Sequence, residues 1–481
     1  MNGIQDRFMM LKEMDRKTGA LLYGWLLLSI LSLVFAGIFA FLIAMSRTPL
    51  IQDFFWIKDF FHKGLVGHVT LAFVVWFLSF MGVLWTVSAG IVTKRDSRFR
   101  FGWIGLYSSS IGTILIIVTT LSGLGAPILA NYVPVLTHPL FYSGLLFFAA
   151  GIFLLLLDIL PAVFKCLRGH SANLITYGMG IAGLLVLIAF TCFGLAWYFL
   201  PSSPAEGFNF ELLFWGGGHI LQFANTISMV VVWIFLLNLT LKTYPLRENL
   251  LKVILGAYLL FAIPAPLYYF IFEIQSPAHK DSFTKLMEFG IGPPTGILII
   301  SIIAAIIGQR IQRGRLPWGD PMFSSLALSV LVFTLGGVIS LTIRGSNVKI
   351  PAHYHSVIGA VTLAFMGLTY HLLSLVNREV YLQRISRIQP YLYGLGVLIF
   401  SLGLFWAGSH GVPRKTAGAA QNLDSYGKIA GMGLMGIGGI IAILGGATFV
   451  INAIFSLLRR RKVEITRAEG ETYGKEFSVN I

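Results

Sequence analysis

Long apolar runs separated by short polar stretches dominate this chain. Twelve of these runs are long enough to cross a bilayer as α-helices, since a crossing needs about 20 residues. They lie near residues 20–45, 65–93, 101–127, 139–164, 173–200, 210–240, 250–274, 284–309, 321–343, 350–376, 388–408 and 429–457. The pattern predicts an all-α membrane protein in which twelve transmembrane helices form one polytopic domain, residues 1–481, with polar tails at about 1–19 and 458–481.

Composition supports this interpretation and adds an orientation. Only 11% of the 481 residues are charged, against about 25% in soluble domains. The net charge of +15 would suit nucleic acid, but 25 of the 35 Lys and Arg residues lie in the two tails and in alternate loops. By the positive-inside rule this places both termini in the cytoplasm of a multi-pass plasma (inner) membrane protein. We therefore expect lipid contacts and no nucleic-acid partner.

Four histidines lie at similar depth on three of the predicted spans. His68, His219, His353 and His355 each follow the outer start of an even-numbered span. An imidazole in hydrocarbon is costly unless it has a partner, so a shared layer of ligands is one interpretation and ordinary structural histidines are the other. The remaining histidines lie near span ends, where we expect structural roles: His62, His138, His170, His279, His371 and His410.

The stretch PAHYHSVIGAVTLAFMG (351–367) favours a cofactor interpretation. At about 100° per residue, His353 and His355 point roughly 200° apart around a helix, so they cannot easily bind one metal ion together. Each can bind the iron of a different planar cofactor, one on either side of the helix. Neutral imidazole is a common axial ligand of haem iron, and His68 from another helix is suited to complete a six-coordinate haem.

Four motifs resemble subunit I of the haem-copper oxidase superfamily, which includes cytochrome c oxidase and the bacterial nitric oxide reductases. They are VGHVTLAFVVWF (66–77), GPPTGI (292–297), AHYH (352–355) and GSHGVPRKT (408–416). The resemblance implies a low-spin haem on His68 and His355 and a high-spin haem on His353. It also implies that Arg414 and Lys415 pair with haem propionates, the alternative being an ordinary solvated loop.

The copper B site of that family is depleted in this sequence. His219, in WGGGHILQF, matches the helix 6 ligand, but Tyr268 and Tyr269 stand where the family has a pair of histidines. Neutral phenol is a poor copper ligand. Phe223 replaces the cross-linking tyrosine of the oxygen-reducing members, and Leu298 replaces the lysine of the oxidase proton channel.

Two functions therefore remain open. In the first, the chain is a terminal oxidase-like or nitric oxide reductase-like oxidoreductase, in which the low-spin haem passes electrons to a high-spin haem that reduces O₂ or NO. His219, Tyr268 and Tyr269 would act on the bound ligand, and Glu288 would lie on a short proton path from outside or make a structural hydrogen bond. In the second, it is a di-haem electron-transfer or gas-sensing subunit without terminal oxidase activity.

The resemblance also implies partners. The chain has no copper-A or c-haem motif of its own. Electrons would therefore enter from the outer face, from a cytochrome c, a cupredoxin or a quinol, within a complex that has other respiratory subunits. We expect weak or absent proton pumping, because no convincing channel from the cytoplasm is evident.

Overall fold

Twelve helices of membrane-spanning length form this chain, as the apolar pattern predicts. The computed structural model describes residues 16–51, 60–93, 99–168, 173–200 and 209–459. Within these residues twelve helical segments are long and apolar enough to cross a membrane, so the chain is a multi-pass membrane protein. The helices are α2 (Arg16–Met45), α3 (Phe60–Val69) continuing through the π-helix η3 (Thr70–Val75) into α4 (Trp76–Thr93), α5 (Arg100–Leu121), α6 (Pro139–Arg168), α7 (Leu174–Phe199), α8 (Phe210–Leu241), α9 (Glu248–Ala262), α11 (Pro277–Arg313), α12 (Pro321–Ser340), α13 (Lys349–Leu375), α14 (Gln383–Ser409) and α15 (Tyr426–Leu458).

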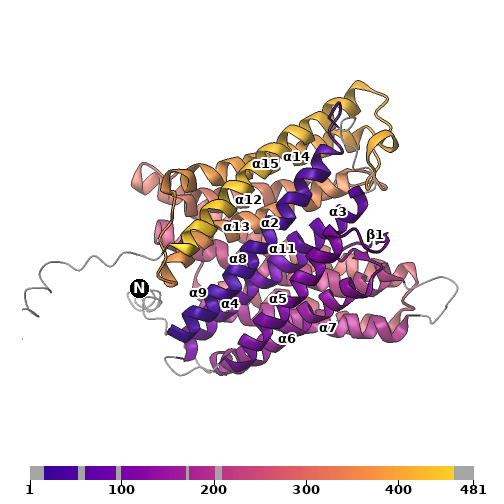
Figure 1. Cartoon of the computed structure of the whole chain (residues 1–481). Coiled ribbons are helices and arrows are strands. Elements are labelled where there is room, and N and C mark those ends of the chain that lie inside the picture. Colours follow the sequence, from indigo (N-terminus) through magenta and orange to yellow (C-terminus); the bar gives the residue numbers. More distant parts are fainter. Residues whose placement is uncertain (1–15, 52–59, 94–98, 169–172, 201–208, 460–481) are drawn as a thin grey trace, which may run out of the picture.

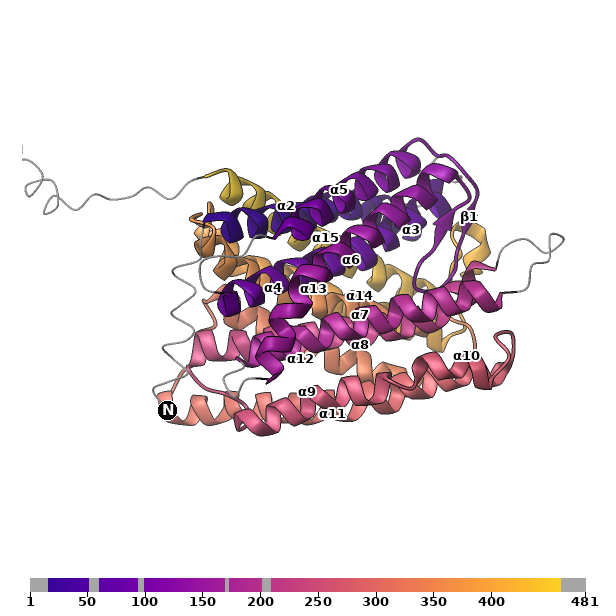
Figure 2. The ribbon, with the colours of Figure 1, turned by 90° about the horizontal axis from the view of Figure 1, so that it is seen from below.

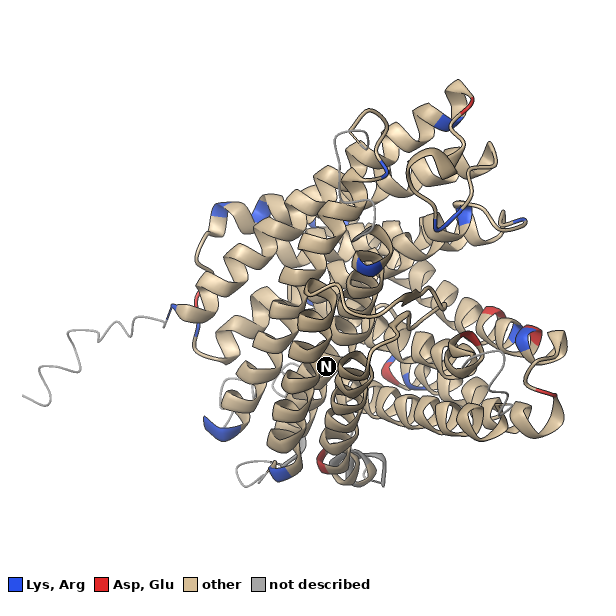
Figure 3. Cartoon of the chain, turned by 45° about the vertical axis from the view of Figure 1, so that its right-hand side comes forward, with Lys and Arg blue, Asp and Glu red and all other residues tan. Residues whose placement is uncertain are grey.

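Short elements cap one end of the bundle. They are the hairpin of β1 (Pro127–Ile128) and β2 (Val135–Leu136), the short helix α10 (Tyr268–Ile271), and the 3₁₀ turns η4 (Ala265–Leu267) and η5 (Gly418–Gln421). Both ends of the described chain lie at the opposite side, at the left in Figure 1. We call the hairpin side the outer end, after the predicted orientation. Most Lys, Arg, Asp and Glu residues lie at helix ends and in loops, as Figure 3 shows, which suits a bundle with an apolar middle.

Close helix pairs depend on glycines at their contacts. Where α5 meets α6, a Cβ on Gly112 would lie 2.5 Å from the carbonyl oxygen of Gly144. Where α14 meets α15, a Cβ on Gly438 would lie 2.2 Å from the backbone nitrogen of Phe400. Since lipid gives no hydrophobic drive for helices to associate, small residues that let backbones approach closely supply much of the packing energy.

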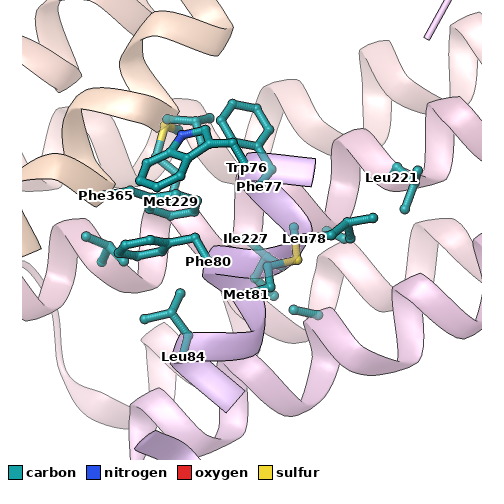
Figure 4. Close-up of a cluster of buried hydrophobic side chains, with 14 of the residues drawn as sticks. Trp76, Phe77, Leu78, Phe80, Met81, Leu84, Leu221, Ile227, Met229 and Phe365 are labelled. Carbon is teal, nitrogen blue, oxygen red and sulfur yellow. The ribbon is translucent and has the colours of Figure 1, made fainter. Parts of the chain in front are cut away.

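The candidate histidines lie on the three most buried spans. The span that includes α3 and α4 is 89% buried over its most apolar window, α8 is 94% buried and α13 is 83% buried. Aromatic rings join these spans: Phe80 of α4 stacks on Phe365 of α13 at 4.2 Å between centroids, beside Trp76 and Met229 (Figure 4). The centre of the bundle is therefore closely packed, and the candidate histidines lie on the helices that form it.

Two spans differ from their predicted bounds for identifiable reasons. The seventh, predicted over 250–274, is interrupted after Ala262, because Pro264 and Pro266 cannot continue an α-helix. The eighth begins at Pro277 rather than at residue 284. Ser276 caps it by accepting a hydrogen bond from the backbone nitrogen of His279 at 3.2 Å, and Pro277 occupies the first turn. Figure 2 shows α9 and α11 side by side, with α10 at the outer end.

Candidate functional site

His68 is fixed by a backbone contact to the neighbouring helix. Its Nδ1 lies 2.9 Å from the carbonyl oxygen of Ala36 in α2. Because a carbonyl only accepts, Nδ1 carries the proton and Nε2 keeps its lone pair. Two residues later the chain changes to the π-helix, in which Trp76 donates to the carbonyl of Leu71. Such single π turns recur at functional sites, because they reset which face a helix presents.

His353 and His355, on opposite sides of α13, also have Nδ1 hydrogen-bonded to a backbone carbonyl oxygen. Nδ1 of His353 lies 2.8 Å from the carbonyl oxygen of Gly336 in α12, and Nδ1 of His355 lies 2.8 Å from that of Pro351. The His355 ring packs on Phe400 of α14 at 4.9 Å. His68 is within electrostatic range of His355. The structure therefore brings His68 and His355 to one side of α13, while His353 faces α12.

Polar contacts at the outer end hold the two predicted basic residues. Lys415 Nζ donates to the carbonyl oxygen of Leu129 at 2.5 Å and to Asn131 Oδ1 at 3.3 Å, and Arg414 reaches the same oxygen at 3.5 Å. Asn131 in turn donates to both carboxylate oxygens of Glu211, at 2.7 Å each. Burial and the neighbouring Arg414 lower the pKa of Lys415. This loop is thus held by hydrogen bonds to Leu129 and Asn131, and its role toward haem propionates stays a prediction.

Arg47 is a basic residue that sequence reasoning missed. It lies in the loop after α2, half-buried, within electrostatic range of Tyr354 and His355. Its Nε and one terminal nitrogen are buried without a hydrogen-bond partner. Burial lowers the pKa of Arg47 to about 10. One feature of the sequence could have pointed to Arg47. It is a cation on the outer side of the first span, against the positive-inside trend.

His219 lies in a cage of aromatic rings. Its Nδ1 lies 2.7 Å from the carbonyl oxygen of Trp215, and the ring is 1% exposed. The rings of Trp215, Tyr132 and Phe283 lie 4.7, 4.8 and 5.9 Å from it. Burial raises the pKa of Tyr132, so this phenol stays neutral. In His219, as in His68, His353 and His355, Nδ1 therefore carries the proton and Nε2 keeps its lone pair.

The glycine triplet before His219 admits protein side chains. Aromatic side chains from other segments lie against these glycines. A Cβ on Gly216 would lie 2.2 Å from Tyr269 Oη, and a Cβ on Gly218 would lie 2.4 Å from the Tyr132 ring. Aromatic rings from outside α8 therefore occupy its glycine face.

The four predicted pocket residues are not all together. Tyr269 is buried beside Gly216, and the Tyr268 ring is half-buried at 5.3 Å from Phe283. The structure brings both to the His219 region. Glu288, in contrast, is exposed on α11 and does not join them. The inward stripe of α11 is formed by Phe283, Leu286, Gly290, Pro294 and Leu298, and a proton path through Glu288 stays a prediction.

Sequence reasoning also misjudged His279. We expected a structural histidine at a span end, yet its ring is fully buried and its two nitrogens lack hydrogen-bond partners. It packs against Tyr269 at 4.8 Å and Phe283 at 5.1 Å. The sequence shows the histidine but does not show that it is buried. The eighth span was predicted to begin at residue 284, after His279, whereas α11 begins at Pro277. Within the described ranges, no group of three or more His, Cys, Asp or Glu side chains is arranged to hold a metal ion.

Comparison with known proteins decides the family. The profile of cytochrome c and quinol oxidase polypeptide I matches residues 20–447. The chain belongs to this family. That confirms the resemblance to haem-copper oxidase subunit I. Among the solved structures, a haem-copper terminal oxidase dimer matches with a TM-score of 0.78 and 19% identity, over 94% of this chain and 86% of the other, which shows the same fold.

Relatives in this family include proteins without an assigned function. An uncharacterised protein of Aquifex aeolicus is 31% identical over 78% of this chain and 89% of its own length. An uncharacterised protein of Rickettsia prowazekii is 28% identical over 89% of this chain and 94% of its own. Cytochrome c oxidase subunit 1 of Thermus thermophilus is 23% identical over 92% and 86%. Family membership alone therefore leaves the substrate open.

Proposed function

We propose that this chain is a membrane haem-binding respiratory oxidoreductase subunit with one low-spin and one high-spin haem. Family membership implies haem cofactors. The observation that carries the proposal is shared by His68, His353 and His355: a backbone carbonyl holds each Nδ1, so each Nε2 is left as the metal-binding nitrogen. All three rings are only half-buried although their helices form the centre of the bundle.

The placement of these histidines matches two haems on opposite sides of α13. His68 and His355 would hold the low-spin haem, since they lie within electrostatic range of each other from separate helices. His353, which faces α12, would hold the high-spin haem. Bound haem supplies one-electron transfer and an open iron position for a small diatomic. Copper B is not part of the proposal, since neutral tyrosines stand in place of two of its ligands.

Cations at the outer end suit the carboxylates of haem. Arg47 has unpaired buried nitrogens near His355, which fits a carboxylate acceptor. Arg414 and Lys415 lie on the loop across from it and would hold further propionates, as their motif implies. The hydrogen bonds from Lys415 to Leu129 and Asn131 orient this pair of cations.

Residues around His219 would act on the bound diatomic. Tyr269 is buried and can donate a hydrogen bond through its hydroxyl, His219 is buried and offers the lone pair of Nε2 as an acceptor, and Tyr268 lies at the edge of the same cluster. Neutral donors in a site shielded from water stabilise charge that develops on a ligand. Glu288 has no part in this proposal, because its side chain is exposed.

The proposed partners are those that the family resemblance implies. Electrons would come at the outer face from a cytochrome c, a cupredoxin or a quinol, and other respiratory subunits would cover exposed apolar helices. Both termini would be cytoplasmic, with weak or absent proton pumping.

Gas consumption tests the proposed reaction. Purified chain in detergent with an artificial reductant should consume O₂ or NO, followed with a gas electrode. His353→Ala should abolish consumption, whereas His371→Ala at the inner end serves as a matched control and should retain it. A chain that binds the gases without consuming either would contradict reduction and would favour the di-haem electron-transfer or sensing function.

A further inference from the structure

Three buried polar atoms where α10 lies against the start of α11 have no hydrogen-bond partner among the described residues. They are Tyr269 Oη and both ring nitrogens of His279. Tyr269 is 3% exposed and His279 is 0% exposed. A buried donor or acceptor without a hydrogen bond is strongly destabilising, so native proteins rarely keep one. Three such atoms close together indicate a bound molecule that makes hydrogen bonds with them. Buried water fills such polar sites in most proteins.

The three atoms lie together beside the aromatic rings that enclose His219. The rings of Tyr269 and His279 lie 4.8 Å apart in an edge-on arrangement. Tyr269 Oη lies against Gly216, one helical turn before His219. His279 is within electrostatic range of His219, and both rings contact Phe283, at 5.1 and 5.9 Å.

The site is held rigidly near the outer surface. His279 belongs to the first turn of α11, at the outer end of the bundle (Figure 2). The indole nitrogen of Trp215 donates to the carbonyl oxygen of the next residue, Lys280, at 3.3 Å, and so ties this turn to α8. Exposed residues of the same turn, such as Asp281, adjoin it in the chain. The pair thus lies between the outer surface and His219.

We propose that Tyr269 and His279 bind water and relay protons from the outer surface toward the ligand site proposed beside His219. An imidazole can accept a proton at one nitrogen and release one from the other, and the phenol passes a proton through its oxygen. Each transfer breaks one N–H or O–H bond and forms another, while electrons reach the ligand from the separate donor. The relay rests on the proposed function, because reduction of O₂ or NO consumes protons. Water binding at the pair does not rest on it.

Thermal unfolding tests the water site without any turnover. The purified full chain, Tyr269→Phe, His279→Phe and the double variant should be compared as a double-mutant cycle. Bridging water predicts that each single variant melts below the parent and that the two losses are less than additive. Single variants that melt at or above the parent temperature would overturn the site, since they would show that nothing satisfied these atoms.

Conservative substitution tests the relay. His279→Gln keeps hydrogen-bonding groups but cannot take up a proton, so it should melt close to the parent yet slow O₂ or NO consumption by about 100-fold. The slowed variant should show a larger rate difference between H₂O and D₂O, whereas His371→Gln should match the parent. A stable His279→Gln variant with the parent's rate would overturn the relay. A parent that consumes neither gas would overturn the proposed function and the relay together, while the melting cycle would still decide the water site.

Discussion

Individual histidines in this chain differ in what satisfies their ring nitrogens, and this difference sets His279 apart from His68, His219, His353 and His355. Backbone carbonyls fix Nδ1 of His68, His353 and His355, so each Nε2 is left for metal. His279 has neither nitrogen satisfied. The sequence suggests the first three through spacing and motif. It cannot reveal the fourth, because an unpaired atom is defined only by what surrounds it.

Replacing single ligands should remove one haem at a time. His353→Ala should lose the CO-binding haem and keep the low-spin spectrum, because His68 and His355 lie on the other side of α13. His68→Ala should lose the low-spin spectrum and keep CO binding. Optical spectra of the reduced proteins, with and without CO, measure both, and His371→Ala is the control. Loss of the same spectral component in both variants would contradict two separate sites.

Tyr132 should make the chain sensitive to alkaline pH. Burial raises its pKa above the ordinary value of 10.0, so above pH 10 the unfolded chain loses this proton while the folded chain keeps it. The folded state then binds more protons, and stability falls as pH rises past 10. In Tyr132→Phe the melting temperature should fall less between pH 9 and pH 11 than in the parent. Equal falls would show that Tyr132 does not contribute.

The sequence predicts the helices well where they are uniformly apolar. It predicts them less well where particular residues set the helix ends or change the helix type. All twelve spans follow from apolar length. The π-helix after His68 and the early start of α11 at Pro277 do not, because a π turn leaves no composition signal and the first turns of α11 are polar. That early start is what carries His279 into the bundle.

Glycines on α8 should be essential for its packing. In Gly216→Ala the new methyl group would lie 2.2 Å from Tyr269 Oη and 2.6 Å from the Phe283 ring, so the variant should lose about 1–3 kcal/mol of stability. Gly194→Ala in α7 is the matched control, because a Cβ there meets nothing within 4 Å. Thermal unfolding in detergent measures both. Equal stability of the two variants would mean that α8 tolerates displacement of Tyr269.

For the whole molecule, the fold could be predicted from the sequence, while the chemistry at the outer end could be predicted only in part. Charge placement and apolar length are properties of the chain alone. The aromatic filling of the glycine triplet, the exposed position of Glu288 and the unpaired nitrogens of Arg47 depend on how separate helices meet. Such contacts between distant segments are not encoded in any one motif.

Haem content and CO reactivity test the account's central claim, which is two haems on opposite sides of α13. We expect two haems per purified chain, by extraction and iron analysis, and reaction of one of the two with CO in the reduced protein. The other should keep the spectrum of a six-coordinate haem with two histidine ligands. One haem per chain, or CO binding to both, would contradict the assignment of His68, His353 and His355.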